Sequence, residues 1–187
     1  DIMEEIATPF WETAFLKKGD REVYHKTFDL IDLPDPKSKG LWSTIYKEKL
    51  RMAGVVQNQQ TDIAKQLASA QGVTRRNQYA LSLFMVINEL QRYSSDLLLL
   101  LQAYDEAPKK DKLNHAIKIR NTVDDFAEIR AGFEEAYAKT RIMGNPEEYQ
   151  LDSNFHHHLA NGTNTTDWIF IYEIAMNLKI KEWLLLT

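Results

Sequence analysis

Cysteine is absent from the 187-residue sequence. Disulfide bonds, thiolate nucleophiles and cysteine-ligated zinc are therefore excluded. The absence of cysteine does not indicate whether the protein works in an oxidising or a reducing compartment. Long hydrophobic runs are absent too, because a stretch such as Leu97–Leu101 falls far short of the roughly 20 apolar residues that cross a bilayer. We therefore expect a chain without a membrane span.

The sequence also lacks a run of Lys or Arg with interleaved aromatic residues, and its formal net charge of −4 is spread along the chain. This distribution gives no sign of a nucleic-acid-binding surface. Strand-like alternation of useful length, internal repeats and low-complexity tracts are missing as well. With 44% hydrophobic residues, the chain is long enough for one globular domain with a sizeable core.

The sequence starts at Asp1, without an initiator Met and without a basic-then-apolar signal segment. From this start we expect a mature form or a fragment excised from a larger chain. The sequence itself therefore carries little information on localisation.

Apolar residues recur at helical spacing over three long stretches. The first runs from Leu41 to Gly72, where the glycine ends the pattern, and Gln60 interrupts its apolar face. The second, residues 74–108, is apolar on more than one face and is predicted to be the central helix. The third runs from Asp111 to Thr140. A fourth stretch, residues 168–186, is apolar nearly all round, which predicts a helix in a groove between the others.

Residues 1–40 follow a looser pattern. Two short helices, near Phe10–Lys17 and Arg21–Asp29, lead into an extended arm with two prolines and a glycine. Residues 41–187 form the helical bundle, in which a long loop at 143–165 precedes the last helix. The predicted fold is all-α, a mostly antiparallel bundle of three long helices plus a C-terminal helix, in one structural domain overall.

The loop ends in the stretch DSNFHHHLANGTNTTDW, residues 152–168, with three consecutive histidines. Imidazole is a common zinc and iron ligand, but ligand sets come from spacings that converge, whereas adjacent side chains generally diverge. A metal site would need His156 or His158 to converge with a carboxylate such as Glu173. We predict no metal and no other cofactor, and interpret the histidines as groups that hydrogen-bond backbone in the loop.

Trp168 follows this loop directly and enters the last predicted helix. Aromatic side chains serve as platforms for sugar rings because they offer a large flat apolar area with a polar edge, although many such residues pack in the core instead. If the loop takes part in recognition, the candidate contact residues are His156, His157, His158, Asn161, Trp168 and Arg141.

Arg130 places a charge on the apolar face of the third helix, between Val123 and Tyr137. A buried charge needs a partner, and Glu134 stands one turn later, where an i,i+4 ion pair forms. The alternative is that the helix is rotated slightly and the Arg130 side chain lies along the surface on its apolar stem.

Two stretches carry a resemblance to a known family. LIDLPDPKSKGLWSTIYKEKL, residues 30–50, and FAEIRAGFEEAYAKTRIMGNPEEYQLDSNFHHHLANGTNTTDWIFIYEI, residues 126–174, resemble the C-terminal helical region of glycoside hydrolase family 20, the β-N-acetylhexosaminidase-like enzymes, of Bacteroidetes. The resemblance implies a family that removes terminal N-acetylhexosamine from glycans on a (β/α)8 barrel. It also implies export to the periplasm, the cell surface or the medium.

The chemistry implied by the resemblance is substrate-assisted: the acetamido group attacks, an Asp orients it and the adjacent Glu acts as acid and base. That Asp-Glu pair belongs at the end of a barrel strand, whereas Asp105-Glu106 lies at the end of a long predicted helix. The resemblance therefore carries no catalytic residue onto this chain, and it implies an accessory domain whose partner is the catalytic domain of the same parent chain or a glycan. Two alternatives stay open, an independent protein-interaction bundle and a metal-dependent bundle enzyme.

Overall fold

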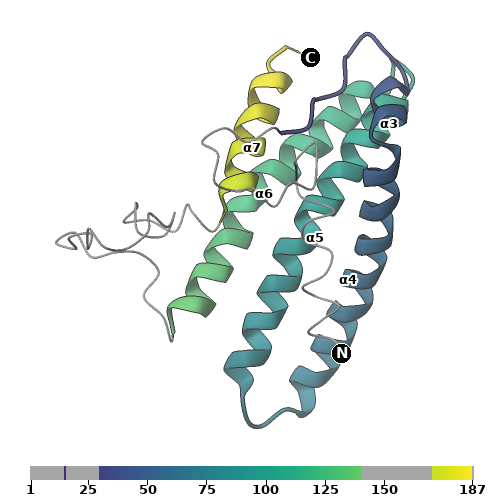
Figure 1. The fold of residues 1–187 in the computed structure, drawn as a ribbon. Coiled ribbons are helices and arrows are strands. Elements are labelled where there is room, and N and C mark those ends of the chain that lie inside the picture. Colours follow the sequence, from purple (N-terminus) through teal and green to yellow (C-terminus); the bar gives the residue numbers. More distant parts are fainter. Residues whose placement is uncertain (1–14, 16–29, 140–169, 187) are drawn as a thin grey trace, which may run out of the picture.

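The computed structural model describes residue 15, residues 30–139 and residues 170–186 (Figure 1). Helices account for most of these residues, and the prediction of an all-α fold is confirmed. The helices are α3 (Leu41–Ile45), α4 (Lys47–Val73), α5 (Gln78–Glu106), α6 (Lys112–Ala138) and α7 (Ile171–Leu184).

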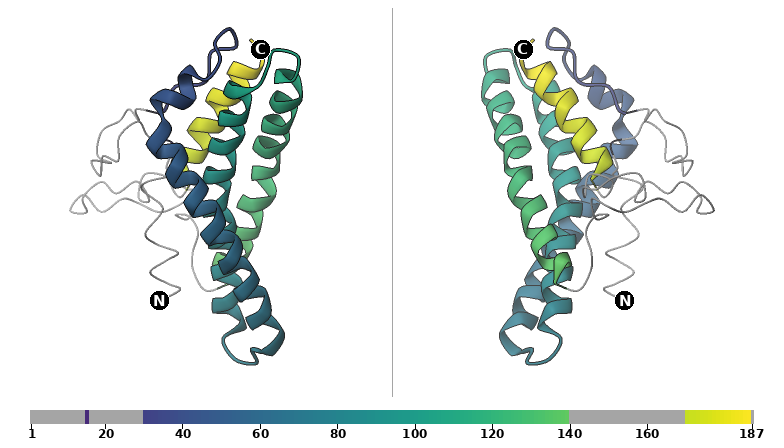
Figure 2. Two further views of the ribbon diagram at one scale, coloured as in Figure 1. Left: turned by 90° about the vertical axis from the view of Figure 1, so that its right-hand side faces the viewer. Right: turned by 90° about the vertical axis from the view of Figure 1, so that its left-hand side faces the viewer.

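The three long helices lie side by side in the order α4, α5, α6, with α5 in the centre (Figure 1). Only residues 74–77 connect α4 to α5, and only 107–111 connect α5 to α6, so consecutive helices run antiparallel. The shorter α7 packs beside one half of the bundle, and the α4–α5 hairpin extends past the end of α6 (Figure 2). The predicted bundle of three long helices plus a C-terminal helix is therefore confirmed.

The core lies where α5, α6 and α7 meet. Tyr104, Leu97 and Leu101 of α5 are fully buried there, with Ile119 of α6 and Met176 of α7. The prediction that α5 is central follows from its apolar residues on more than one face, since one helix side packs on α4 and another on α6 and α7.

The first long helix differs from its prediction at Tyr46. The backbone of this residue, with φ −98° and ψ 19°, leaves the α-helical region and separates α3 from α4. Its hydroxyl accepts a hydrogen bond from the Asp32 backbone N–H at 3.0 Å and donates one to the Asp32 carboxylate at 3.2 Å. Helical spacing in the sequence carries no information about this contact with the arm. The sequence therefore predicted one continuous helix.

Two other boundaries shift by a few residues. Gly72 stays helical, and α4 ends at Val73 because Thr74 is extended, with ψ 121°. The last helix begins at Ile171 rather than Trp168, with Phe170 as its N-cap residue. Phe170 is fully buried, and its packing fixes the start of α7.

The arm at residues 30–40 is held by side chains of α3, which follows it directly, and of the distant helix α7. The indole N–H groups of Trp42 and Trp183 donate to the carbonyls of Asp32 and Pro34, at 2.6 and 3.0 Å. Lys179 Nζ donates to the Ile31 carbonyl at 2.8 Å. Extended chain has no helical partners for its carbonyls, so these donors satisfy groups that would otherwise be costly to bury.

Several predictions from the sequence fall outside the described residues. They are the two short N-terminal helices and the loop at 143–165, and the boundary between residues 1–40 and 41–187 stays a prediction. Among the helices that the structure describes, none combines the length and the apolar character needed to cross a bilayer.

Candidate functional site

The six contact residues proposed from the sequence lie outside the described part of the chain. They are Arg141, His156, His157, His158, Asn161 and Trp168. The carboxylate suggested as their metal partner, Glu173, is described and lies in the first turn of α7.

Glu173 is a buried carboxyl group on the face of α7 that points into the bundle. Its side chain shares that face with Met176 and Ile180, and the residue is only 4% exposed. Burial raises the pKa of Glu173 to about 7, against a smaller opposing effect of a hydrogen bond with its own backbone. Glu173 can therefore change its protonation state near neutral pH.

A second buried polar contact lies one turn further along α7. The Tyr93 hydroxyl of α5 donates to Asn177 Oδ1 at 2.6 Å, and both residues are buried. Burial raises the pKa of Tyr93, and the negative charge of Glu173 acts in the same direction. Tyr93 therefore stays protonated and serves as a hydrogen-bond donor that fixes α7 on α5.

The structure of Arg130 has features of both interpretations drawn from the sequence, the ion pair with Glu134 and a side chain that lies along the surface. Its Nε lies 2.8 Å from Glu134 Oε1, so the predicted i,i+4 ion pair forms. Both side chains are only half-buried, and the guanidinium carbon lies 5.3 Å from the centre of the Phe170 ring. The cation–π contact and the ion pair together compensate the partly desolvated charge.

A polar groove of about 480 Å³ runs between α5 and α6. Carboxylates dominate its lining, and Arg92 on its edge pairs with Asp96 at 3.1 Å. Within the described ranges, no three His, Cys, Asp or Glu side chains are grouped so that they could hold a metal ion. The groove is therefore an acidic surface feature without the convergence that a metal site needs.

The interruption of the first apolar face at Gln60 has a structural cause. Gln60 is fully buried between α4 and α5, where its Nε2 donates to Gln91 Oε1 at 3.1 Å. Its backbone carbonyl accepts from Asn88 Nδ2, also at 3.1 Å. These contacts join α4 to α5 and are structural.

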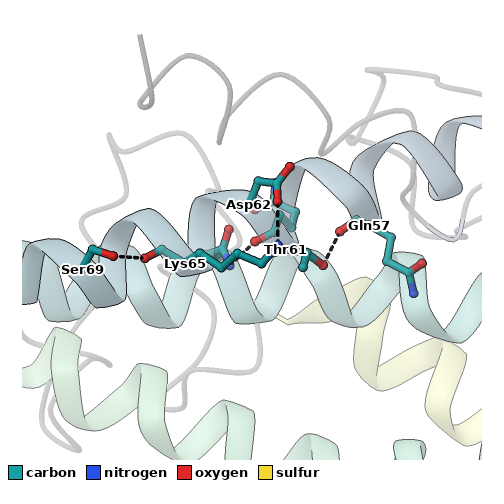
Figure 3. A network of polar contacts seen from close by, with 7 residues as sticks. Gln57, Thr61, Asp62, Lys65 and Ser69 are labelled. Atoms are coloured by element: carbon teal, nitrogen blue, oxygen red, sulfur yellow. Dashed lines mark hydrogen bonds and ion pairs between the residues drawn. The ribbon is translucent and has the colours of Figure 1, made fainter.

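Figure 3 shows the neighbouring polar network of α4. Thr61 and Ser69 donate to backbone carbonyls one turn earlier, and Lys65 Nζ lies 3.0 Å from Asp62. These three contacts join residues three or four apart in one helix, which is the ordinary pattern of a solvated helix face, and Gln57 Nε2 donates across to Asp96 Oδ1 of α5. The network therefore carries no sign of a binding site.

Asp105, the acidic residue of the Asp-Glu pair, is fully buried at the end of α5. Its Oδ2 accepts from the backbone N–H and the hydroxyl of Ser43, at 2.8 and 2.9 Å. Ser43 lies in the first turn of α3, so Asp105 caps that helix from another element. The Asp-Glu pair thus lies at the C-terminal end of a long helix, as the sequence predicted.

A further groove, of about 460 Å³, lies beside the arm, where α6 begins and α7 ends, and we call it the arm groove. Three positively charged residues line it, and no acidic residue does. Its lining residues are Pro36, Tyr104, Lys109, Lys112, Leu113, Ala116, Ile117, Arg120 and Leu184.

The wall of the arm groove is built by Lys112. Its Nζ donates to the carbonyls of Pro36 and Ser38, at 3.2 and 2.8 Å, and lies 4.8 Å from the centre of the Tyr104 ring. Burial, and then the charge of Asp35, raises the pKa of Tyr104. These contacts hold the arm at the start of α6, so the groove exists before any partner binds.

Sequence reasoning missed the arm groove although a signal was present. Leu113 and Ile117 lie four residues apart, on a different side of α6 from the predicted apolar face. In the structure both are exposed, at 70% and 46%. A second apolar face within the basic start of a helix is typical of an interaction surface.

Comparison with known proteins adds no family assignment. No family model matches the chain, and no curated protein or solved structure matches it.

Proposed function

We propose that this chain is an accessory, non-catalytic helical domain of a glycan-degrading glycoside hydrolase of the β-N-acetylhexosaminidase type. In this role it supports the catalytic domain or contributes to substrate recognition. The observation that carries the proposal is the resemblance of residues 30–50 and 126–174 to the C-terminal helical region of family 20 enzymes. The partner is then the catalytic domain of the same parent chain or a glycan, at the cell surface, in the periplasm or in the medium.

The packing around the second stretch supports the proposal. Phe126 and Phe133 of α6 lie edge to face against Phe170, with ring centroids 5.9 and 5.5 Å apart. The two described ends of the stretch thus meet in one aromatic cluster. A region that resembles one part of a family and whose two described ends pack against each other has the properties expected of a domain.

The role of Asp105 also supports a non-catalytic domain. Its carboxylate is occupied by the N–H and hydroxyl of Ser43 and lies buried at a helix end. A family 20 catalytic pair would instead face an open sugar subsite. The chemistry would therefore reside in the catalytic domain of the parent chain.

The proposal is tested with the purified chain, p-nitrophenyl N-acetyl-β-glucosaminide, chitobiose and a family 20 catalytic domain supplied separately. We expect no hydrolysis by the chain alone, no stoichiometric metal by elemental analysis, and binding to chitobiose or to the catalytic domain. Trp168→Ala and His157→Ala should weaken chitobiose binding if the loop contributes, whereas His25→Ala, outside the loop, is the matched control. Hydrolysis by the chain alone, or no binding to either partner, refutes the proposal.

The second candidate is an independent helical protein-interaction domain. Exposure of Leu113 and Ile117 in the arm groove is the observation that favours it, because exposed apolar clusters with a polar rim mark interaction surfaces. A metal-dependent bundle enzyme is a third possibility, and it would require stoichiometric metal whose binding is lost in a His156→Ala or His158→Ala variant.

A further inference from the structure

We infer that the arm groove docks an acidic amphipathic helix of a partner protein. The identity of that partner, the catalytic domain of the parent chain, rests on the proposed function. The chemistry of the groove is argued from its own residues.

The floor of the arm groove is apolar and exposed. Leu113 and Ile117 stand one turn apart on α6 and are 70% and 46% exposed. Leu184 lines the groove from α7, and Leu185 and Leu186 follow it at the exposed end of that helix. Leu113, Ile117 and Leu184 thus line one groove with apolar side chains whose burial would favour association.

The rim of the arm groove is positively charged. Lys109 and Arg120 line it, and neither forms an ion pair with another described residue. Lys112 is buried behind them, where its ammonium group binds two backbone carbonyls and lies over the Tyr104 ring without an ion pair to another described residue. No acidic residue belongs to the lining. Charge complementarity therefore selects a partner segment with carboxylates around apolar side chains.

The size and spacing of the groove favour a helix as the occupant. Its volume of about 460 Å³ accommodates several side chains, and three of its apolar lining residues, Leu113, Ala116 and Ile117, follow one another along α6. An amphipathic helix presents apolar side chains at i, i+3 or i+4 and i+7, which is the spacing of an anchor set for such a groove. The arm, Lys112 and Trp183 hold the walls in place, so little reorganisation opposes docking.

The test uses the whole chain and two labelled peptides of about four helical turns each. One peptide has Leu at the anchor positions and Glu elsewhere, and the other has Lys in place of Glu. Fluorescence anisotropy measures both dissociation constants at low and at physiological salt. We expect tighter binding of the acidic peptide, with an affinity that falls as salt rises.

Two double variants separate the groove from general electrostatics. Lys109→Glu with Arg120→Glu should weaken acidic-peptide binding at least about tenfold, since attraction becomes repulsion. Arg75→Glu with Arg76→Glu makes the same change of charge in the α4–α5 connection, at the other end of the bundle (Figure 1), and should leave binding within about twofold.

The apolar floor is tested with Leu113→Ser and Ile117→Ser, which change exposed side chains and should leave the fold intact. Each should weaken binding of the acidic peptide about tenfold. Equal binding of the two peptides, or equal losses in the two charge variants, overturns the inference. The assay contains neither glycan nor catalytic domain. Selective peptide binding by a chain that binds neither a family 20 catalytic domain nor chitobiose would therefore uphold the groove while refuting the proposed function.

Discussion

Replacing Glu173 by Gln should change how the stability of this chain depends on pH. A buried carboxyl group whose pKa is raised keeps its proton in the folded state at a pH where the unfolded chain has already released it. Between the unfolded value of 4.5 and the folded value of about 7, the free energy of unfolding therefore falls as pH rises. Above the folded pKa the loss of stability is complete, and below the unfolded pKa no stability is lost.

The expected size of this effect follows from the shift itself. Each pKa unit corresponds to about 1.4 kcal/mol, so ionised Glu173 lowers the free energy of unfolding by about 3 kcal/mol above pH 7. Glu173→Gln is neutral at every pH and has nearly the same shape as the protonated acid. The variant should match the parent protein at pH 4 and should be about 3 kcal/mol more stable at pH 8.

Urea denaturation followed by tryptophan fluorescence, in steps from pH 4 to pH 8.5, measures both curves. The difference between variant and parent removes the contributions of all other titrating groups. Glu182→Gln changes an exposed glutamate of the same helix and should give no such difference. A difference between Glu173→Gln and the parent that is flat with pH, or that grows toward acid, would refute the account of Glu173.

Three further substitutions test single contacts by denaturant unfolding. Tyr93→Phe leaves Asn177 Oδ1 buried without its donor and should cost about 1–3 kcal/mol, so a neutral effect would contradict the contact. Asp105→Ala removes the acceptor of two Ser43 donors and should cost about 2 kcal/mol, whereas Glu106→Ala beside it is the exposed control. Gly40→Ala forces a side chain to φ 73° and should cost about 1 kcal/mol, and equal stability would contradict that strain.

Local patterns made most of the fold predictable. Buried residues such as Ala53, Ile63 and Val123 fall where helical spacing places them, because one face of each long helix must be apolar. The Arg130–Glu134 pair was predictable for the same reason, since both residues belong to one helix. These features depend on residues three or four positions apart, which a single sequence displays directly.

Contacts between distant segments were not predictable. The break at Tyr46 depends on Asp32, and the position of the arm depends on Lys179 and Trp183, which are 148 and 149 positions from the carbonyls that they bind. The raised pKa of Glu173 arises in the same way, because its burial depends on the packing of α7 and not on the residues beside it in the sequence. The predicted contact residues at 141–168 stay a prediction.

The end of the bundle that carries the arm groove is positively charged because the arm is extended chain. Backbone carbonyls in such a segment need donors, and only long cationic or indole side chains reach them from the neighbouring helices. Lys112, Lys179 and Trp183 fill that role, and their recruitment concentrates positive charge beside the arm. α6 begins and α7 ends there with exposed leucines, so the requirement that fixes the arm also makes this end of the bundle a surface suited to an acidic, apolar partner.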